Sequence, residues 1–489
     1  MVCKRIKNRN QRKIYKRIII RGLLVLYTPT CLGGGDTDGN IDLQILRDSI
    51  EDKALLMGSS IAGVLRNYLR KYQNRDEFLL FGGLRTDENS DQSPLIINDA
   101  ISSELIKAEL RDGVKIDSIT RTAESQGKYD TEFLEAGTEF PLCFELLIEE
   151  KPDTPNYESS LLKGLAIALQ GLENGEISLG MKKHRGFGRC HIKEWQVWNF
   201  NLKDASDRIA WLTFDHSWLT KPPCTKSADP KTSIVEAMKE AGLKFPEEWD
   251  DKREFCKIDA TFTLASPLLI RSGQASSDKA PDVVHLKSWR NGELKPVLSG
   301  TSLAGVLRHR AERIINTIGK NTSIIENIFG SDLYKNKTSE AKASRLIVHE
   351  SVIENTTDLV QNRIAIDRFT GGTLHGALFN EQPIFPKDNA HLKLNLELRN
   401  PQNHEIGLLL LLIKDLWTGD LPVGGASSIG RGRLQGKKAT ITLRRKQENT
   451  EFENITFTIE QSSPKETLVI SDVKYLENFV SELNNEVNK

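Results

Sequence analysis

The sequence predicts an α+β protein built from two consecutive domains, each with the ferredoxin-like (RRM-like) βαββαβ order. Three observations support this prediction. A set of motifs occurs twice in the same order, each half alternates strand-like and helix-like segments, and the 489-residue chain exceeds what one hydrophobic core usually serves. Halves of about 200 residues are ordinary domain sizes.

The repeat is clearest in one helix-like motif, GSSIAGVLR at 58–66, which recurs as GTSLAGVLR at 300–308. Three more pairs follow in the same order: FGGL at 81–84 and FGSDL at 329–333, KIDSIT at 115–120 and AIDRFT at 365–370, and RGFGR at 185–189 and IGRGR at 429–433. A series in register indicates two copies of one structural plan. We predict copy 1 at 1–200, a linker at 201–255, copy 2 at 256–445 and a C-terminal extension at 446–489.

Each copy shows its elements in the same sequence. Alternating apolar residues predict first strands at 18–27 and 258–270, and a Gly-Ser/Thr-Ser start predicts a helix whose hydroxyls cap the first turn. Apolar stretches then predict strands at 139–148 and 392–398 and helices at 159–172 and 405–416. A Gly-rich basic loop and a last strand follow. In this order two helices cover one face of an antiparallel sheet, and the other face stays free to meet RNA.

Composition excludes several classes of protein. No apolar run approaches 18 residues, so we expect no membrane span. The six cysteines form no CxxC pair and are too sparse for a secreted disulfide scaffold, and the basic N-terminus lacks the features of a signal peptide. We therefore expect reduced thiols and a cytoplasmic location.

Charge is zero overall, with 67 basic and 67 acidic residues, but the basic residues gather inside the repeated motifs. For any single cluster, a solvated helix face or turn explains the charge as well as a binding site does. Because the clusters recur in both copies, a local basic groove is favoured, and such a groove is compatible with a neutral total.

Common catalytic motifs are missing. The sequence has no GxxxxGK[ST] loop, GxGxxG fingerprint, HExxH helix, GxSxG elbow or Cys/His zinc spacing. This argues against an ATPase, a dehydrogenase, a metalloprotease, a hydrolase or a zinc module.

Taken together, the four repeated motifs and the glycine-rich loop after the first strand resemble the RAMP superfamily. Within it they are most similar to the backbone subunits of type III CRISPR-Cas effector complexes, here two fused in tandem. The resemblance implies thumb insertions at about 117–137 and 367–386. It also implies CRISPR RNA, target RNA and other effector subunits as partners, both RAMP backbone proteins and the large subunit, in a prokaryotic cytoplasm.

The resemblance further implies target-RNA cleavage by an aspartate between the first strand and the first helix. Asp42 in copy 1 and Asp282 in copy 2 match that place. An ionised carboxylate there can accept a proton from a 2′-hydroxyl or help to hold a divalent cation, for which Mg²⁺ is expected, with Asp36 and Asp38 as further candidate ligands. An ordinary turn aspartate is the alternative. Pro281 and its neighbours depart from the family's pattern, which leaves open that only copy 1 is active.

Phosphate binding is expected from hydroxyls at the two helix starts and from cations in the motifs. Simple helix capping is the alternative for the hydroxyls. The candidate RNA-binding residues are Ser59, Ser60, Arg66, Lys182, Lys183, Arg185, Arg189, Thr301, Ser302, Arg308, Arg431 and Arg433.

Three functions remain from the sequence. The first is a CRISPR RNA-binding backbone subunit that cleaves complementary target RNA, making it an RNA-guided endoribonuclease within a complex. The second is a structural RNA-binding backbone without activity. The third is a repeat-processing endoribonuclease of the same superfamily, which would need a histidine near a first helix, where the sequence offers His285 and His309 in copy 2.

Overall fold

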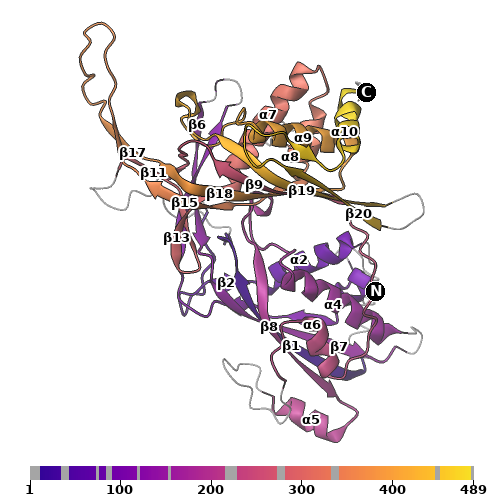
Figure 1. Ribbon diagram of the computed structural model, residues 1–489. Coiled ribbons are helices and arrows are strands. Elements are labelled where there is room, and N and C mark those ends of the chain that lie inside the picture. The colour runs from indigo at the N-terminus through magenta and orange to yellow at the C-terminus, as the bar shows by residue number, and fades with distance from the viewer. Residues whose placement is uncertain are drawn as a thin grey trace.

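The computed structural model describes residues 12–34, 43–72, 76–83, 91–117, 120, 122–151, 156–214, 228–272, 281–331, 341–446 and 452–485. It contains two α+β units, copy 1 in indigo to magenta and copy 2 in orange to yellow (Figure 1). The predicted fold class is confirmed.

Copy 1 has a four-stranded antiparallel sheet in the order β3-β7-β1-β8, which is the ferredoxin-like arrangement. Along the chain, helix α2 follows β1 and helix α4 follows β7. The elements are β1 (Ile14–Leu26), α2 (Gly58–Lys71), β3 (Leu95–Ile97), β7 (Glu139–Glu149), α4 (Tyr157–Glu173) and β8 (Cys190–Asn201), with the short β2 (Leu55–Leu56), α3 (Asp76–Phe81) and β4 (Ala100–Ile101) between β1 and β7.

Copy 2 repeats this order as β14-β18-β9-β19 and extends the sheet on both sides. The repeated elements are β9 (Phe255–Leu264), α7 (Gly300–Thr317), α8 (Ser323–Phe329), β14 (Leu346–Val348), β18 (Ile384–Arg399), α9 (Asn403–Trp417) and β19 (Leu434–Lys446). The extensions are β12 (Lys287–Arg290), β13 (Glu293–Leu298) and β15 (Ser351–Asp358) on one side and β20 (Phe452–Glu460) and β21 (Val469–Ile470) on the other. The tail ends in α10 (Val473–Asn485), which packs on α9.

Alternation along the first strands builds the two cores. In β1, Ile18, Ile20 and Leu24 are buried in the core of copy 1, and in β9 Ile258 and Phe262 are buried in that of copy 2. Successive strand residues point to opposite faces, so each alternating run commits one face of its sheet to the helices.

The other face of the copy 1 sheet is partly covered, contrary to the prediction that it stays free. Ile19, Trp198 and Phe200 are buried there against Ala210 and Phe214. These last two belong to or follow α5 (Ala205–Leu212). The covering residues come from the segment that composition had suggested was only a linker.

A second helix of this segment, α6 (Ile234–Glu240), joins the core of copy 1. Ile234, Ala237 and Met238 are buried in that core. Residues 234–243 therefore pack as part of copy 1.

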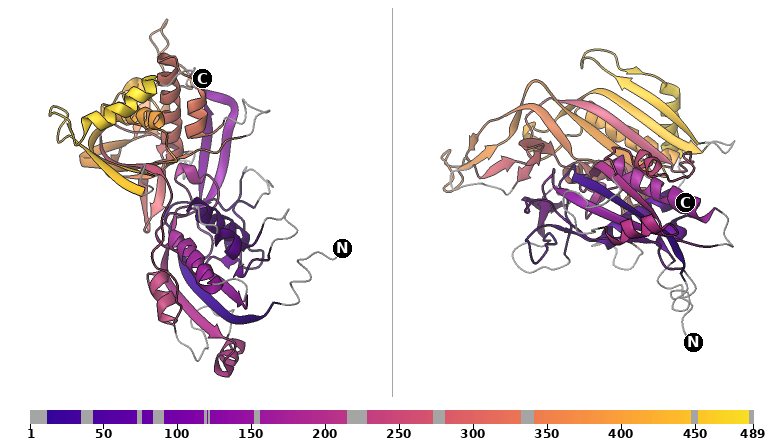
Figure 2. Two further views of the ribbon diagram at one scale, coloured as in Figure 1. Left: turned by 90° about the vertical axis from the view of Figure 1, so that its right-hand side faces the viewer. Right: turned by 90° about the horizontal axis from the view of Figure 1, so that it is seen from below.

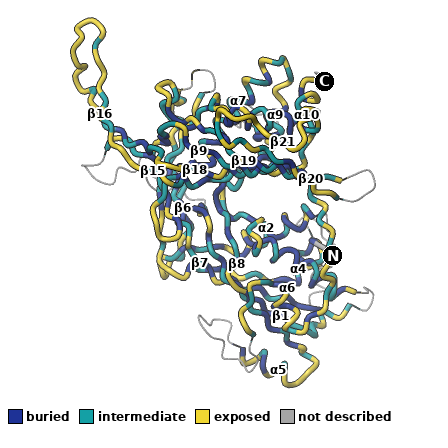
Figure 3. The backbone as a smooth tube through the Cα atoms, in the orientation of Figure 1, coloured by how far each residue is buried: buried dark blue, intermediate teal, exposed yellow. Residues whose placement is uncertain are grey.

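A long hairpin projects from each copy. We call β5 (Ala108–Ile116) and β6 (Ala123–Leu134) arm 1, and β16 (Gln361–Arg363) and β17 (Phe379–Gln382), with their connection, arm 2. Arm 2 extends far from the sheet and is exposed along most of its length (Figures 1 and 3). The predicted thumb ranges 117–137 and 367–386 were wrong at their start, because they begin at the tip and omit the outgoing strands.

Arm 1 lies against copy 2 (Figure 2, left). Arg111 Nη1 donates to Glu350 Oε2 at 2.6 Å, and Ser288 Oγ donates to Glu109 Oε2 at 2.9 Å. Arg290 also pairs with Glu350. We call these five residues the junction latch, and it ties the base of arm 1 to copy 2.

Among the helices that the structure describes, none has the length and apolarity needed to cross a membrane.

Candidate nucleic-acid interface

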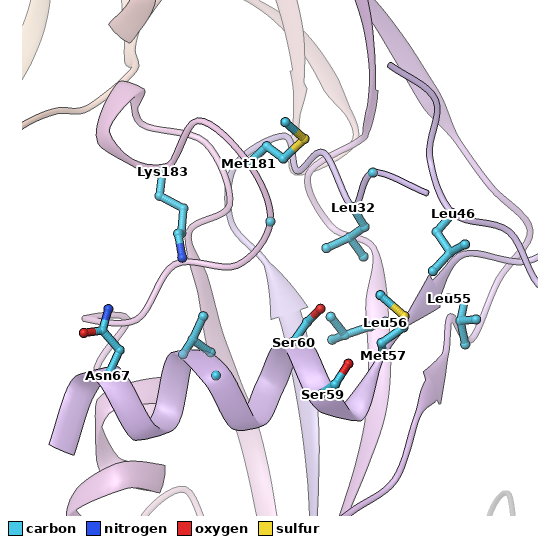
Figure 4. A pocket seen from close by; sticks show the side chains of 14 residues that line it. Leu32, Leu46, Leu55, Leu56, Met57, Ser59, Ser60, Asn67, Met181 and Lys183 are labelled. Carbon is cyan, nitrogen blue, oxygen red and sulfur yellow. The ribbon is translucent and has the colours of Figure 1, made fainter. Parts of the chain in front are cut away.

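A groove runs beside the first helix of copy 1. Its cavity of about 380 Å³ is bounded by apolar residues before the helix, by α2 itself and by the Gly-rich loop. Ser59 and Ser60 lie on the first turn of α2, and Lys183 extends toward the helix from the loop opposite (Figure 4). The lining residues are Leu32, Gly33, Leu46, Leu55, Leu56, Met57, Ser59, Ser60, Gly63, Val64, Asn67, Gly180, Met181 and Lys183.

The two serines do not cap α2, so the predicted capping role was wrong in copy 1. The N-cap is Met57, which forms no side-chain cap bond, and the Gly58 N–H instead donates to Asp99 Oδ1 at 2.7 Å. Ser59 and Ser60 are exposed. Their hydroxyls are therefore available to a ligand at a helix N-terminus, where anions are favoured.

The Gly-rich loop has the same strained shape in both copies. It forms a short turn, η1 (Lys183–Arg185) or η2 (Ser427–Ile429), flanked by residues with positive φ. A Cβ on Gly188 would lie 1.8 Å from Leu179 O, and one on Gly432 would lie 1.9 Å from Val423 O. Only glycine fits at these two positions, which explains the recurring Gly-x-Gly-Arg motif.

Two lysines of this loop occupy different places. Lys183 lines the groove, and burial together with Arg399 lowers its pKa. Lys182 Nζ donates to Thr131 Oγ1 of arm 1 at 3.1 Å and lies 4.3 Å from the Tyr129 ring centroid. Lys183 thus lies at the groove, whereas Lys182 joins the loop to arm 1.

The two arginines of the copy 1 loop are not among the residues that line the groove. Arg185 lies at the contact with copy 2, where a Cβ on Gly300 would come within 2.2 Å of Arg185 O. Arg189 stacks on Tyr27 at 5.4 Å from the ring centroid and is half-buried.

The second helix start is covered by copy 1, unlike the first. The Arg185 carbonyl sits over Gly300 at the start of α7. Ser299 is the N-cap and accepts from the Ser302 N–H at 3.2 Å, and its own hydroxyl donates to Ser302 Oγ at 2.9 Å. Thr301 is exposed. The two copies are therefore not equivalent as phosphate sites.

Arg66 and Arg308 make one repeated structural contact. Arg66 Nη2 donates to Gly82 O at 3.0 Å, and Arg308 Nη1 donates to Gly330 O at 3.1 Å. Gly82 and Gly330 belong to the repeated Phe-Gly motif. Each arginine therefore joins the first helix of its copy to the turn that follows the second, shorter helix. This contact competes with the predicted role in phosphate binding.

Arg431 and Arg433 lie in different surroundings, one buried and one exposed. Arg431 is 3% exposed and pairs with buried Glu381 of arm 2 at 2.9 Å. Its charge is already neutralised, and it is not at a surface that RNA could reach. Arg433 is exposed.

Asp282 lies at the base of arm 2 and is exposed. Its Oδ2 accepts from the Asn380 N–H at 2.7 Å. The next residue, Val283 of β11 (Val283–His285), pairs in parallel with Glu381, just as Leu43 pairs in parallel with Thr131 in copy 1. This register equates Val283 with Leu43. Asp42, Asp36 and Asp38 lie outside the described residues.

The described parts of the chain hold no group of three or more His, Cys, Asp or Glu side chains that could bind a metal ion. His285 is not available as a catalytic base, because it is 3% exposed and its Nδ1 accepts from the Ile270 N–H at 3.1 Å. Burial lowers the pKa of His285 to about 4. This weakens the case for a repeat-processing endoribonuclease.

Sequence reasoning missed two sets of residues at this interface. Asn67 and Met181 line the groove but belong to no recognisable motif. The junction latch draws on residues from distant segments, and only the pairing of the two copies in space reveals it.

The RAMP superfamily profile matches residues 24–191 and 261–435, one region in each copy. No curated protein matches the chain. Membership supports a CRISPR-associated, RNA-binding role with effector subunits as partners. The two matched regions account for most of the sequence, and the chain belongs to the RAMP superfamily.

Proposed function

We propose that this chain is a backbone subunit of a type III CRISPR effector complex, with two RAMP units fused in tandem, which binds CRISPR RNA and cuts complementary target RNA. The observation that carries the RNA-binding part is the groove of copy 1. There the exposed hydroxyls of Ser59 and Ser60 face the loop that carries Lys183. A helix N-terminus with free hydroxyls and a facing cation suits a phosphate backbone, which is contacted without regard to base.

The arms support a role on a duplex. Arm 2 projects from its sheet and carries exposed apolar residues, among them Phe369 with 99% of its surface exposed and Ile366 with 63%. An exposed aromatic ring can stack on a nucleotide base. An arm of this kind is suited to reach between the guide and the target strand.

Catalysis is assigned to Asp42 and Asp282. As a general base, the carboxylate takes the proton of a target 2′-hydroxyl; the 2′-oxygen attacks the adjacent phosphorus, and the 5′-oxygen of the next nucleotide leaves with a proton from water. The alternative role of the carboxylate is to help hold Mg²⁺. One carboxylate is enough where substrate phosphates supply other ligands, and the ion would neutralise charge on the phosphate.

The test is cleavage of a labelled complementary RNA by the full chain in its guide-loaded complex with Mg²⁺. We compare wild type with Asp42→Ala, Asp282→Ala and the double variant, and use Asp388→Ala, an exposed aspartate of β18, as the matched control. Loss of one discrete product per active-site variant, with guide binding unchanged, is the expected result.

A second candidate is a structural backbone subunit without activity. It is favoured by the bond from the Asn380 N–H to Asp282, which gives this carboxylate a place in the base of arm 2. Unchanged products in all variants would select this candidate. Lys183→Ala separates binding from cleavage, because it should weaken guide binding under either candidate.

A further inference from the structure

Arm 2 has an edge strand with no partner on its outer side. The small sheet at its base runs in the order β10 (Arg271–Ser272), β11, β17 and β16, so β16 lies at the edge. Within the described part of the chain, β16 pairs only with β17. The arm extends away from the rest of the molecule (Figure 1). A free strand edge is a template for pairing with another chain.

Alternate residues of this outgoing strand turn their backbone to the free edge. The Leu359 N–H donates to Pro383 O at 3.4 Å, so Leu359 faces the returning strand. Inward and outward residues alternate along an antiparallel pair, which directs the N–H and C=O of Val360 and Asn362 away from β17. These groups are placed to form hydrogen bonds with an added strand.

The side chains on one face of the strand are largely apolar and exposed. Val360, Asn362 and Ile364 are spaced by two residues and therefore share that face. Val360 is 50% exposed and Ile364 is 48% exposed. β-branched side chains at this spacing favour contact with a second pleated strand. A hollow of about 620 Å³ opens along the strand and is lined by Gln361, Asn362, Arg363, Ile364, Ala365 and Phe379.

The equivalent stretch of arm 1 is a protein contact in this structure. Counted back from the Ile-Asp motif at each tip, Glu109 and Arg111 correspond to Leu359 and Gln361, and the strand pairings agree with this alignment. Glu109 and Arg111 contact copy 2 through the junction latch. Arm 2 therefore exposes a stretch that the repeat uses for protein contact, with an apolar and a neutral side chain in place of the two charges.

RNA is not the ligand that this stretch favours. Between residues 359 and 382 the sequence has two arginines and two acids, so the arm carries no excess charge for a phosphate backbone. Arg363 is paired with Glu381 at 2.9 Å. Val360 and Ile364 are aliphatic and offer no ring on which a base can stack. The aromatic ring of Phe369, at the tip, is a separate feature.

A second copy of this chain fits the strand poorly. The arm-binding face of copy 2 has Glu350 two residues after β14, and copy 1 has Asp99 two residues after β3. Asp99 is exposed. A second chain would therefore set a carboxylate against an apolar strand, which is unfavourable.

We infer that the outgoing strand of arm 2, with Val360, Asn362 and Ile364, docks an extended segment of a different protein by strand addition. The segment carries apolar side chains at alternate positions, and its backbone pairs with the edge of β16. This site goes beyond RNA binding, and it rests on the proposed function only in that the partner is a subunit of the same complex.

Photocrosslinking in the purified complex tests the site. Ile364 is replaced by a photoreactive benzophenone amino acid in the full chain, which is expressed with its guide RNA and the other subunits. We expect a product that is heavier by the mass of one other subunit and resists ribonuclease. Leu374 is the control position and should give little product, because it is 51% exposed but lies on the other face, where its N–H donates to Ala365 O at 2.9 Å.

Two substitutions at one residue test the backbone pairing. Asn362→Pro removes the outward N–H and should lower retention of the crosslinked subunit by about 2–10-fold, the effect of one lost hydrogen bond. Asn362→Ala keeps the N–H and should leave retention unchanged. Ile364→Asp should lower it by about tenfold or more, because a carboxylate is then buried against apolar groups. The guide RNA content of the complex, which reports the proposed function, should be the same in all three variants.

Each other outcome overturns a defined part of the proposal. A ribonuclease-sensitive product would assign the strand to RNA, and a product of twice the chain's mass would assign it to a second copy. Equal crosslinking from Ile364 and Leu374, or equal losses in Asn362→Pro and Asn362→Ala, would contradict strand addition. No product from a complex that retains its guide RNA overturns the docking site while the proposed function stands. A protein crosslink in a complex without guide RNA contradicts the proposed function and leaves the docking site intact.

Discussion

Arg66 and Arg308 end the two copies of the repeated helix motif and make the same contact with a glycine carbonyl. The distances are 3.0 Å to Gly82 O and 3.1 Å to Gly330 O. Each bond joins the first helix of its copy to the turn that follows the next helix along the chain. The repetition of the arginine in both copies is therefore explained by structure before any role with RNA is considered.

Replacing Arg308 by alanine should lower the free energy of unfolding by about 1.5–3 kcal/mol, the usual contribution of a hydrogen bond to a charged donor. Arg308 is half-buried, so the loss is measurable by denaturant titration of the full chain. Arg313→Ala, an exposed arginine on the same helix, is the control and should have little effect. An Arg308→Ala variant with wild-type stability and weaker RNA binding would instead support the phosphate role.

Arg431 shows why single basic residues could not be assigned from the sequence. It belongs to the repeated Gly-x-Gly-Arg motif, yet its side chain is buried against Glu381. The equivalent position in copy 1 is Phe187, whose ring stacks on that of Phe133 with 4.4 Å between the ring centroids. The loop and the arm are joined by an ion pair in one copy and by aromatic rings in the other. A pattern of charges cannot tell a cation that meets an internal acid from one that meets RNA.

The tips of both arms use one turn. Asp117 Oδ1 accepts from the N–H of Thr120 at 2.7 Å, and Asp367 Oδ1 accepts from the N–H of Thr370 at 2.8 Å, with the threonine hydroxyl donating in each case. An aspartate that accepts backbone N–H groups fixes a tight turn locally. The repeated Ile-Asp motif is thus the signature of the arm tip.

Bonds from Thr370 and Phe369 lower the pKa of Asp367 below its ordinary value of 3.8. Since the folded turn favours the ionised form, its order is present above that value and is lost as the pH falls through the lowered pKa. We expect the Asp367 carboxyl to titrate below pH 3.8 in an NMR titration, and Asp367→Ala, which removes the accepting oxygen, to disorder the tip at all pH values. Titration at the ordinary value would show that these bonds do not hold the tip in solution.

Element order was predictable because each core strand and helix repeats its apolar pattern over many residues. Leu408 and Leu412 of α9, for example, fall on one buried face as the apolar run indicated. The predicted thumb ranges began too far along the sequence because the outgoing strands contain few apolar residues. Arg111 and Glu109 are buried through pairing with copy 2, which a pattern within one segment does not reveal. The fold followed from local periodicity, whereas the contacts between copies did not.

The junction latch should make the two copies unfold together. Although burial opposes ionisation, Arg111 and Arg290 lower the pKa of Glu350, so its carboxylate is charged between the two guanidinium groups. Glu350→Gln keeps the shape of the side chain but leaves the buried charges of Arg111 and Arg290 without their carboxylate. Such a change typically lowers the free energy of unfolding by about 3–5 kcal/mol. Calorimetry of the full chain should then show one transition splitting into two. Glu397→Gln, at a half-buried pair with Arg399, is the control and should keep a single transition.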